Sequence, residues 1–466
     1  MLNTLKARTV EKECLKTMKH IGNASVKVSR PDRVRDETGL LPLSMNTPVN
    51  EEHLMEHVVD QSNILCAFNR VKQNGGSPGI DGITVENLPD IFIHHWPVIC
   101  NLLLSGEYQP QPVKRVEIPK LQGGHRLLGI PTVVDRCIQQ ALLQVLQPEW
   151  DRTFSDSSYG FRPNRSAHDA VLKAQSYLHK GYAWVVDIDL EKFFDRVNHD
   201  KLMSLVLMRI KDRRVVTLIH RYLKAGVLIG ENYHETPEGT PQGGPLSPLL
   251  ANLLLDKLDK ELECRKHHFV RYADDCNIYV KSARSGRRVM AGITEYLKGK
   301  LKLSVNEAKS AVDRPWKRAF LGFTFTRRRP NRRKTSNKAL KRFKEEIRRI
   351  TRRTRGVTLM KVVKDLKSYL TGWKLYFGFS EAKSVFQGLD SWIRRRLRCY
   401  IWKQWGRAGY RRLVEHGVTR DLAWFTAKSA HGPWRISQSP ALSFALPKKY
   451  FVGLGLPLLY DKKTVD

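Results

Sequence analysis

The chain contains 466 residues, and its 81 lysines and arginines outnumber the 46 aspartates and glutamates to give a net charge of +35. Hydrophobic residues make up 41% of the chain, enough to fill a core, which excludes a disordered basic tail. Because so large a positive charge opposes compaction unless a polyanion neutralises it, the composition predicts a nucleic-acid partner whose binding weakens as salt rises.

The sequence favours neither a membrane nor a zinc site. No apolar run is long enough to span a bilayer, and no secretory signal core follows the lysine-rich N-terminus. The seven cysteines never form a Cys-x-x-Cys pair, and the adjacent His267 and His268 lack metal-spaced partners. We therefore expect free thiols, no zinc and a cytoplasmic protein.

Two segments open the chain. Residues 1–55 are charged and weakly patterned, which predicts an extension that becomes ordered only on RNA. Residues 56–180 alternate helical patterns with Gly- and Pro-rich loops, one of which is Asn-Gly-Gly-Ser-Pro-Gly-Ile-Asp-Gly at 74–82. A second distinctive string, Ser-Tyr-Gly-Phe-Arg-Pro-Asn-Arg-Ser, occupies residues 158–166.

Residues 118–131 predict a hairpin whose Gly-Gly turn is flanked by Lys120 and Arg126. A lysine and an arginine at a hairpin tip suit an incoming triphosphate, because arginine offers a fork of donors and lysine a point charge. Two solvated charges beside a turn are the alternative interpretation.

A buried strand is predicted over residues 184–189, where apolar residues line one face. The two-residue period of a strand places Asp187 and Asp189 together on the other face. Asp189 stands at the strand exit, five residues before the aromatic Phe194, and is a candidate metal ligand. Asp187 is interpreted as structural.

The string Gly-Thr-Pro-Gln-Gly-Gly-Pro-Leu-Ser-Pro at 239–248 predicts a sharp loop that allows its backbone to approach another molecule closely. Ser247 and Pro248 then open an apolar run that predicts a helix, since proline is tolerated in a first turn. The loop could lie directly against a base pair, or it could be an ordinary Gly-Pro turn.

The most informative string is Tyr-Ala-Asp-Asp at 272–275, which lies between apolar and aromatic residues and predicts a β-hairpin with Asp274 and Asp275 at its tip. Adjacent aspartates repel each other unless a cation lies between them, and Mg²⁺ prefers carboxylate oxygens and substrate phosphates. Together with Asp189 on another strand, they would complete a two-metal site for phosphoryl transfer. A solvated turn is the alternative for the pair alone.

After residue 325 the pattern becomes helical and basic. Residues 327–356 carry 15 lysines and arginines and only two acids, and residues 391–405 place aromatic and aliphatic side chains on one helical face with arginines on the other. The aromatic face predicts core, and the basic faces predict RNA or duplex contacts, although a basic amphipathic helix could also lie on a membrane. The predicted nucleic-acid contacts are Arg327, Arg328, Arg329, Arg332, Arg333, Lys334, Arg348, Arg349, Arg352, Arg353, Arg394, Arg395, Arg396 and Arg398.

The strand-exit aspartate and the Tyr-Ala-Asp-Asp hairpin resemble motifs A and C of reverse transcriptases. The strings at 74–82, 158–166 and 241–248 narrow the resemblance to bacterial group II intron-encoded reverse transcriptase/maturases. Leu-Ser-Val-Asn-Glu-Ala-Lys-Ser at 303–310 and Phe-Leu-Gly-Phe at 320–323 are similar to palm and primer-gripping segments of that family.

The resemblance implies an α+β right-hand polymerase, with fingers and an antiparallel palm sheet, followed by an α-helical thumb. The implied domains are an N-terminal extension (1–55), fingers (56–180), palm (181–325), thumb or maturase domain X (326–414) and a C-terminal DNA-binding segment (415–466). Many family members add a Cys- and His-rich endonuclease domain, and we expect this chain to lack one.

The resemblance also assigns roles. Asp189, Asp274 and Asp275 would hold two Mg²⁺ ions. Lys120 and Arg126 would bind the nucleotide phosphates, Phe194 would exclude the ribose 2′-hydroxyl, and Gln242 would contact the nucleotide. The implied partners are the group II intron RNA, target DNA with its primer, and dNTPs.

The implied function is an RNA-directed DNA polymerase and maturase that assists splicing and copies its intron into DNA during retrohoming, in the bacterial cytoplasm and at the nucleoid when acting on DNA. One alternative is a domesticated reverse transcriptase in defence or repair. Another is a splicing-only maturase with a dormant polymerase, which the three intact acids disfavour.

Overall fold

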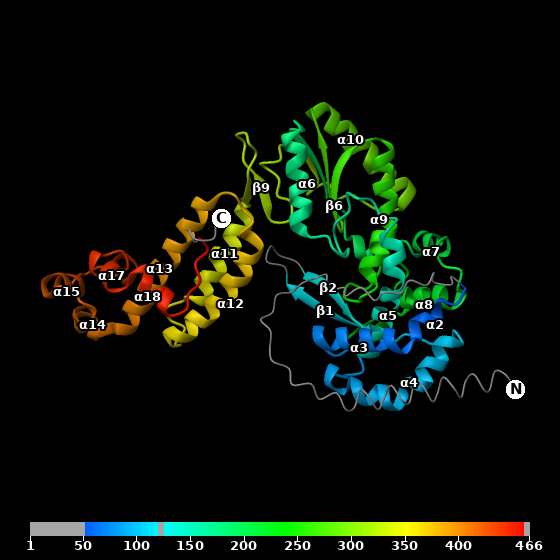
Figure 1. Cartoon of the computed structure of the whole chain (residues 1–466), viewed down its shortest axis with the longest axis horizontal. Coiled ribbons are helices and arrows are strands. Elements are labelled where there is room, and N and C mark those ends of the chain that lie inside the picture. The colour runs from blue at the N-terminus through cyan, green and yellow to red at the C-terminus, as the bar shows by residue number, and fades with distance from the viewer. Residues whose placement is uncertain (1–51, 120–124, 461–466) are drawn as a thin grey trace. The chain divides into compact units, whose positions relative to one another are not determined.

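The computed structural model describes residues 52–119 and 125–460 (Figure 1). These residues form two compact units. The first runs as far as Asp313, and the second begins at Arg314 and includes Leu178–Lys180. Residues 314–325, which the sequence analysis assigned to the palm, therefore cluster with the second unit.

The first unit combines helices with two four-stranded sheets. Local sequence sets several helix starts, because the side chains of Asp60, Thr132 and Asp212 accept hydrogen bonds from the first turns of α3, α5 and α8. The apolar faces of the helices meet in one buried core. The helices are α2 (Leu54–Val59), α3 (Gln61–Asn74), α4 (Leu88–Leu104), α5 (Val133–Asp151), α6 (Ala167–His179), α7 (His199–Leu207), α8 (Arg213–Lys224), α9 (Ser247–Cys264) and α10 (Ala283–Tyr296).

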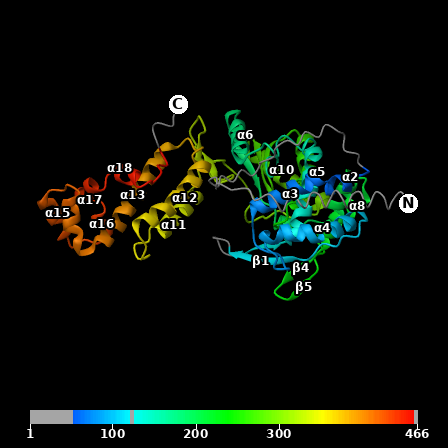
Figure 2. The same ribbon diagram turned by 60° about the horizontal axis from the view of Figure 1, so that its bottom comes forward.

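One sheet has the order β2-β1-β4-β5, and Figure 2 shows β1, β4 and β5 together. Its strands are β1 (Val113–Pro119), β2 (His125–Ile130), β4 (Val227–Ile229) and β5 (Asn232–His234). β1 and β2 are antiparallel with Pro119 opposite His125, which confirms the predicted hairpin. Its turn, with Lys120 and the glycine pair, lies outside the described residues.

The other sheet carries the predicted acids. It is antiparallel, has the order β6-β7-β3-β8, and consists of β3 (Trp184–Ile188), β6 (His268–Tyr272), β7 (Asp275–Val280) and β8 (Ala311–Asp313). Helix α10 packs against it (Figure 1) at Gly286, where an added Cβ would lie 2.4 Å from a Val312 methyl group. The predicted strand over 184–189 and the hairpin over 269–280 are both confirmed.

The second unit begins with a two-stranded sheet and continues as helices, which confirms the predicted change to helical structure. Its elements are β9 (Phe323–Phe325), β10 (Arg333–Thr335), α11 (Asn337–Ile350), α12 (Leu359–Phe377), α13 (Lys383–Trp405), α14 (Gly409–Glu415), α15 (Arg420–Ala427), α16 (Pro433–Ile436), α17 (Pro440–Ala445) and α18 (Lys448–Gly453). Its core contains Phe343, Ile393, Leu397 and Tyr400, so the apolar face of α13 packs inward as predicted.

In the part of the chain that the structure describes, no helix is long and apolar enough to cross a membrane. The six cysteines of that part are not joined in disulfides.

Candidate active site

Asp189, Asp274 and Asp275 lie at one end of the β6-β7-β3-β8 sheet. Asp189 follows the last residue of β3, Asp275 begins β7, and Asp274 lies in the turn from β6. Ile188 pairs with Cys276, so the end of β3 lies beside the start of β7. The structure therefore places the three acids predicted from sequence in one neighbourhood.

Desolvation, together with the negative charges of this neighbourhood, raises the pKa of Asp275 to about 7. Desolvation contributes most, followed by the negative charges of Asp274, Asp187 and Asp189, while the Lys309 ammonium opposes the shift. The residue still keeps part of its surface in solvent, so water screens part of the repulsion between the carboxylates. Asp187, interpreted from sequence as structural, thus belongs to the same electrostatic cluster.

Lys309, in the string at 303–310, is a cation of the site that the sequence pattern did not predict. Its Nζ lies 3.1 Å from Oδ2 of Asp189. That oxygen is buried and accepts no hydrogen bond from the described residues, so charge attraction joins it to Lys309. The neighbouring Ser310 and Asn306 fix the Asp189 backbone, since Ser310 Oγ accepts from Asp189 N at 2.9 Å and Asn306 N donates to Asp189 O at 2.8 Å.

These residues fit a hard divalent cation, the kind of ion that reverse transcriptases generally use. Three carboxylates lie at the strand ends, and one oxygen of Asp189 lacks a hydrogen bond within the described part of the chain. The ammonium of Lys309 lies where a cation is favoured. Among the described residues, no group of three or more His, Cys, Asp or Glu side chains already forms a compact metal-ligand cluster. The acids are therefore electrostatic neighbours rather than a closed cage.

The turn that presents Asp274 and Asp275 is held by a buried arginine. Ala273 in this turn has φ 54°, a left-handed conformation that non-glycine residues rarely adopt. Arg271 is fully buried and its Nη1 donates to Ala273 O at 3.0 Å. Its Nε and Nη2 bind both oxygens of Asp259 at 2.8 and 2.5 Å. The guanidinium thus ties the turn to α9.

Gly160, from the string at 158–166, packs directly under the same turn. An added Cβ at Gly160 would lie 2.3 Å from Ala273 N, so only glycine fits without displacing the backbone. Asn252 of α9 joins the two segments, because its Nδ2 donates to Gly160 O at 2.9 Å and its Oδ1 accepts from Arg271 Nη1 at 2.9 Å. Sequence reasoning found the string but not this contact.

Phe194 follows Asp189 by five residues, and Gln242 lies in the loop between the two acid-bearing segments of the chain. Phe194 is partly buried in a single 3₁₀ turn, Phe193–Asp195, where its ring meets Phe193 edge-on with centroids 5.1 Å apart. Gln242 O accepts from Gly129 N of β2 at 2.8 Å, which docks the 239–248 loop on the first sheet. Arg126 belongs to β2, but its side chain and all of Lys120 lie outside the described structure.

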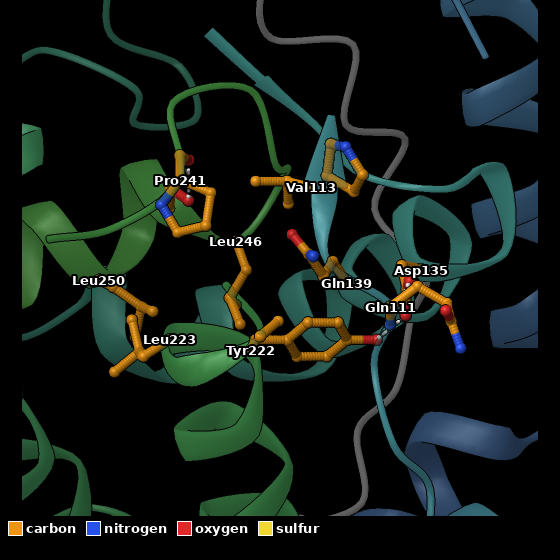
Figure 3. Close-up of a pocket in the computed structure, with 12 residues that line it drawn as sticks. Gln111, Val113, Asp135, Gln139, Tyr222, Leu223, Pro241, Leu246 and Leu250 are labelled. Carbon is orange, nitrogen blue, oxygen red and sulfur yellow. Dashed lines mark hydrogen bonds between the residues drawn. The ribbon is translucent and has the colours of Figure 1, made fainter. Parts of the chain in front are cut away.

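A cavity of about 20 Å³ lies between α5, α8 and the start of α9 (Figure 3). It holds roughly one water molecule and is too small for a nucleotide. Figure 3 shows Tyr222 directed toward Asp135, which also accepts hydrogen bonds from Tyr108, Thr132 and the Gln111 backbone. Burial raises the pKa of Asp135, and these hydrogen bonds oppose that rise. Pro241, Leu246 and Ser247 also line the cavity, so this cluster packs against the 239–248 loop.

The predicted nucleic-acid contacts of the second unit fall into two groups. Eight are exposed, namely Arg327, Arg328, Arg329, Arg332, Arg348, Arg349, Arg352 and Arg353. Others are partly buried and bonded within the unit: Arg396 Nε donates to Thr351 Oγ1 at 2.6 Å, and Arg398 Nε donates to Leu446 O at 3.0 Å. Arg395 lies 3.8 Å above the Trp434 ring.

The remaining three predicted contacts are also partly buried. Arg333 in β10 stacks on Phe379 at 4.2 Å, Arg394 donates to Ser391 Oγ at 2.9 Å, and Lys334 is the third.

Comparison with known families matches two consecutive parts of the chain. Residues 118–325 match the family described as "Reverse transcriptase (RNA-dependent DNA polymerase)". Residues 340–416 match the family described as "Group II intron, maturase-specific domain". The first match contains all three acids, and the second contains α12 and α13.

Individual relatives agree with these matches. Protein YkfC of Escherichia coli (strain K12) is 34% identical over 277 residues, covering 51% of this chain and 72% of that protein. Group II intron-encoded protein LtrA of Lactococcus lactis subsp. cremoris is 45% identical over 163 residues, covering 35% of this chain and 27% of LtrA. The match thus spans about a quarter of LtrA. A chain of the solved structure titled "Partial Cas6-RT-Cas1--Cas2 complex" is 27% identical with a TM-score of 0.34, covering 53% of this chain and 43% of that one.

The acids at the ends of an antiparallel sheet, inside the matched region, define the class: this is an RNA-directed DNA polymerase. The chain belongs to the reverse transcriptases that carry a group II intron maturase domain. The predicted fold class, enzyme class and family are therefore confirmed.

Proposed function

We propose that this protein binds the RNA of its own group II intron, assists splicing, and copies that RNA into DNA at a target site during retrohoming. The observation that carries the proposal is the meeting of Asp189, Asp274 and Asp275 at one sheet end, in a chain that continues into a matched maturase domain. Chemistry and RNA binding are then assigned to different residues of one chain.

The proposed reaction is nucleotidyl transfer. The 3′-hydroxyl of a DNA primer attacks the α-phosphate of a dNTP, a new phosphodiester bond forms, and pyrophosphate leaves. When bound, two Mg²⁺ ions would activate the hydroxyl and neutralise the leaving pyrophosphate. Asp189, Asp274 and Asp275 would hold these ions, and the Ser310 and Arg271 contacts keep their backbones in place.

Other side chains would select and hold the nucleotide. Lys120 and Arg126 neutralise the triphosphate. The ring of Phe194 lies against the sugar and excludes a 2′-hydroxyl, and Gln242 contacts the new base pair.

We assign RNA binding mainly to the thumb at 326–414, with help from the fingers (56–180) and the extension (1–55). The palm (181–325) carries the chemistry, and residues 415–466 bind target DNA. The eight exposed arginines of the second unit supply phosphate contacts, which require surface charge rather than a fixed geometry. We expect the protein to act in the cytoplasm and at the nucleoid.

The decisive test is incorporation of dTTP on a poly(rA)/oligo(dT) template with Mg²⁺ by the purified protein, beside an Asp274→Ala variant. The proposal predicts activity in the wild type and none above background in the variant. Equal activity in both proteins would remove the acids from the chemistry. Inactivity of both, even with intron RNA added, would favour the splicing-only alternative.

A domesticated reverse transcriptase in defence or repair remains the second candidate. It would make DNA in the same assay but would not stimulate splicing of a group II intron. In vitro splicing of the flanking intron, with and without protein, separates the two.

A further inference from the structure

The loop that leads to Gln242 is docked on the backbone of the Phe194 segment. Thr240 N donates to Phe194 O at 2.6 Å, and Gly239 N donates to Val197 O at 2.7 Å. The carbonyl of the residue proposed as sugar gate is therefore fixed by the same loop that places Gln242. We therefore expect a shift of this loop to displace the backbone of Phe194.

Gly239 allows this close approach. Its φ is +94°, and an added Cβ would lie 2.9 Å from Asp195 O and 3.0 Å from Phe194 O. Both neighbours are backbone atoms that cannot rotate away, so the loop and the gate segment share one fitted arrangement.

His199 holds the Gly239 loop in place through the carbonyl of Gly239. It is the first residue of α7, is 5% exposed, and its Nε2 lies 2.6 Å from Gly239 O. Because a carbonyl oxygen only accepts, Nε2 carries the proton and donates it. The other ring nitrogen, Nδ1, is buried and has no hydrogen-bond partner within the described structure. Within the described structure, the hydrogen bond of the imidazole to Gly239 O is therefore the one that its ring nitrogens make.

We propose that His199 is a positioning residue for nucleotide sugar selection, acting through Gly239 and Thr240 on Phe194. The inference rests on the proposed function, in which Phe194 is the gate. Phe193, 2% exposed, packs edge-on against Phe194 and supports the ring from the core. The hydrogen bond from Thr240 in the loop holds the backbone of Phe194. Loss of the His199 donor frees the loop, lets the gate ring retreat, and admits ribonucleotides.

The measurement is the ratio of kcat/KM for dTTP to that for UTP, in single-nucleotide primer extension. His199→Leu removes the donor at similar volume, and we expect the ratio to fall about fivefold to tenfold, the factor that one lost hydrogen bond represents. His199→Gln keeps an amide donor at the position of Nε2, and its ratio stays close to that of the wild type. If His199 only stabilised the fold, kcat/KM for dTTP and kcat/KM for UTP would fall together, and their ratio would not change.

Asn198→Ala is the matched control for general damage to α7. Asn198 caps this helix by accepting from Lys201 N at 2.9 Å, and no hydrogen bond connects its side chain to Gly239 in the described structure. We expect this variant to lower the melting temperature without changing the sugar ratio. If it relaxes the ratio as far as His199→Leu does, the specific role of His199 is refuted.

Phe194→Ala separates this inference from the proposed function. If it leaves the ratio unchanged, the gate assignment and the inference fall together. If it relaxes selection while folded His199→Leu does not, only the inference is overturned. Should His199→Leu fail to fold, His199→Met, which also lacks a donor, takes its place in the same comparison. A relaxed ratio then supports the role of His199, and an unchanged ratio refutes it.

Discussion

A buried arginine of the first unit and two exposed arginines of the second show how differently the two units use positive charge. Arg271 in the first unit has no exposed surface, and its guanidinium is shared among Asp259, Asn252 and Ala273 O. Arg352 and Arg353 in the second unit are exposed on the surface. Arg271 fixes the conformation of the turn that carries Asp274 and Asp275, whereas Arg352 and Arg353 add positive charge to the surface.

The difference follows from what each region must do. Nucleotidyl transfer requires acids held in one arrangement, so the turn carrying Asp274 and Asp275 is locked by a buried ion pair and by Gly160. RNA binding requires phosphates to be neutralised, and many exposed cations can share that task. Single substitutions should therefore be severe in the first region and mild in the second.

The largest effect is expected at the buried pair. Arg271→Leu leaves Asp259 with an uncompensated buried charge and should lower the free energy of unfolding by about 3–5 kcal/mol. Chemical denaturation monitored by circular dichroism measures this loss.

The double variant Arg271→Leu with Asp259→Leu sharpens the test, because it removes both charges. Stability should largely return, since buried pairs are often replaceable by apolar residues. Primer extension should be low in both the single and the double variant, because Ala273 O has lost the Arg271 donor in each. Full recovery of activity in the double variant would show that the pair serves folding alone.

A smaller effect is expected from pH. The pKa of Asp275 is raised to about 7 in the metal-free protein, above its ordinary value. An acid with a raised folded pKa takes up protons on folding, so it stabilises the fold at low pH, and this contribution is lost as pH rises from about 4 to 7.

Asp275→Asn removes that dependence. In EDTA, the melting temperature of Asp275→Asn relative to wild type should therefore be higher at pH 8 than at pH 5. Mg²⁺ should reduce the difference by favouring the ionised wild-type carboxylate. A difference that does not change with pH would contradict the raised pKa of Asp275 in the folded protein.

The smallest effect is expected on the basic surface. Arg352→Ala should weaken intron RNA binding by about fivefold or less and reduce the slope of log affinity against log salt by about one. Filter binding across a salt series measures both quantities. Arg398→Ala is the matched control, since Arg398 bonds to Leu446 O and Ser443 Oγ and should lower the melting temperature without changing the slope.

The sequence predicted the features that depend on short-range pattern. The strand before Asp189, the hairpin carrying Asp274 and Asp275, and the basic helices all follow from alternation, turn composition and helical period. Neither segment alone predicts the order of the strands in the sheet. The resemblance was therefore needed to predict that the acids meet at one end of it.

The missed features depend on long-range contacts. Lys309 lies 120 residues after Asp189, and the Arg271–Asp259 pair depends on how α9 packs under the sheet. Likewise, helical period places Arg396 and Arg398 away from the apolar face, yet neighbouring segments cover them. Periodicity assigns a face to a residue but does not say which element will pack there.

The most direct test of separate chemistry and binding is a paired measurement on Asp189→Asn, which keeps the size of the side chain and removes its charge. Primer extension and intron RNA affinity should be measured on the same preparation, with wild type beside it. The account predicts that extension falls by about 10³-fold or more, the scale of losing a catalytic group, while affinity changes by less than about threefold. Loss of both together would show that one site serves both functions.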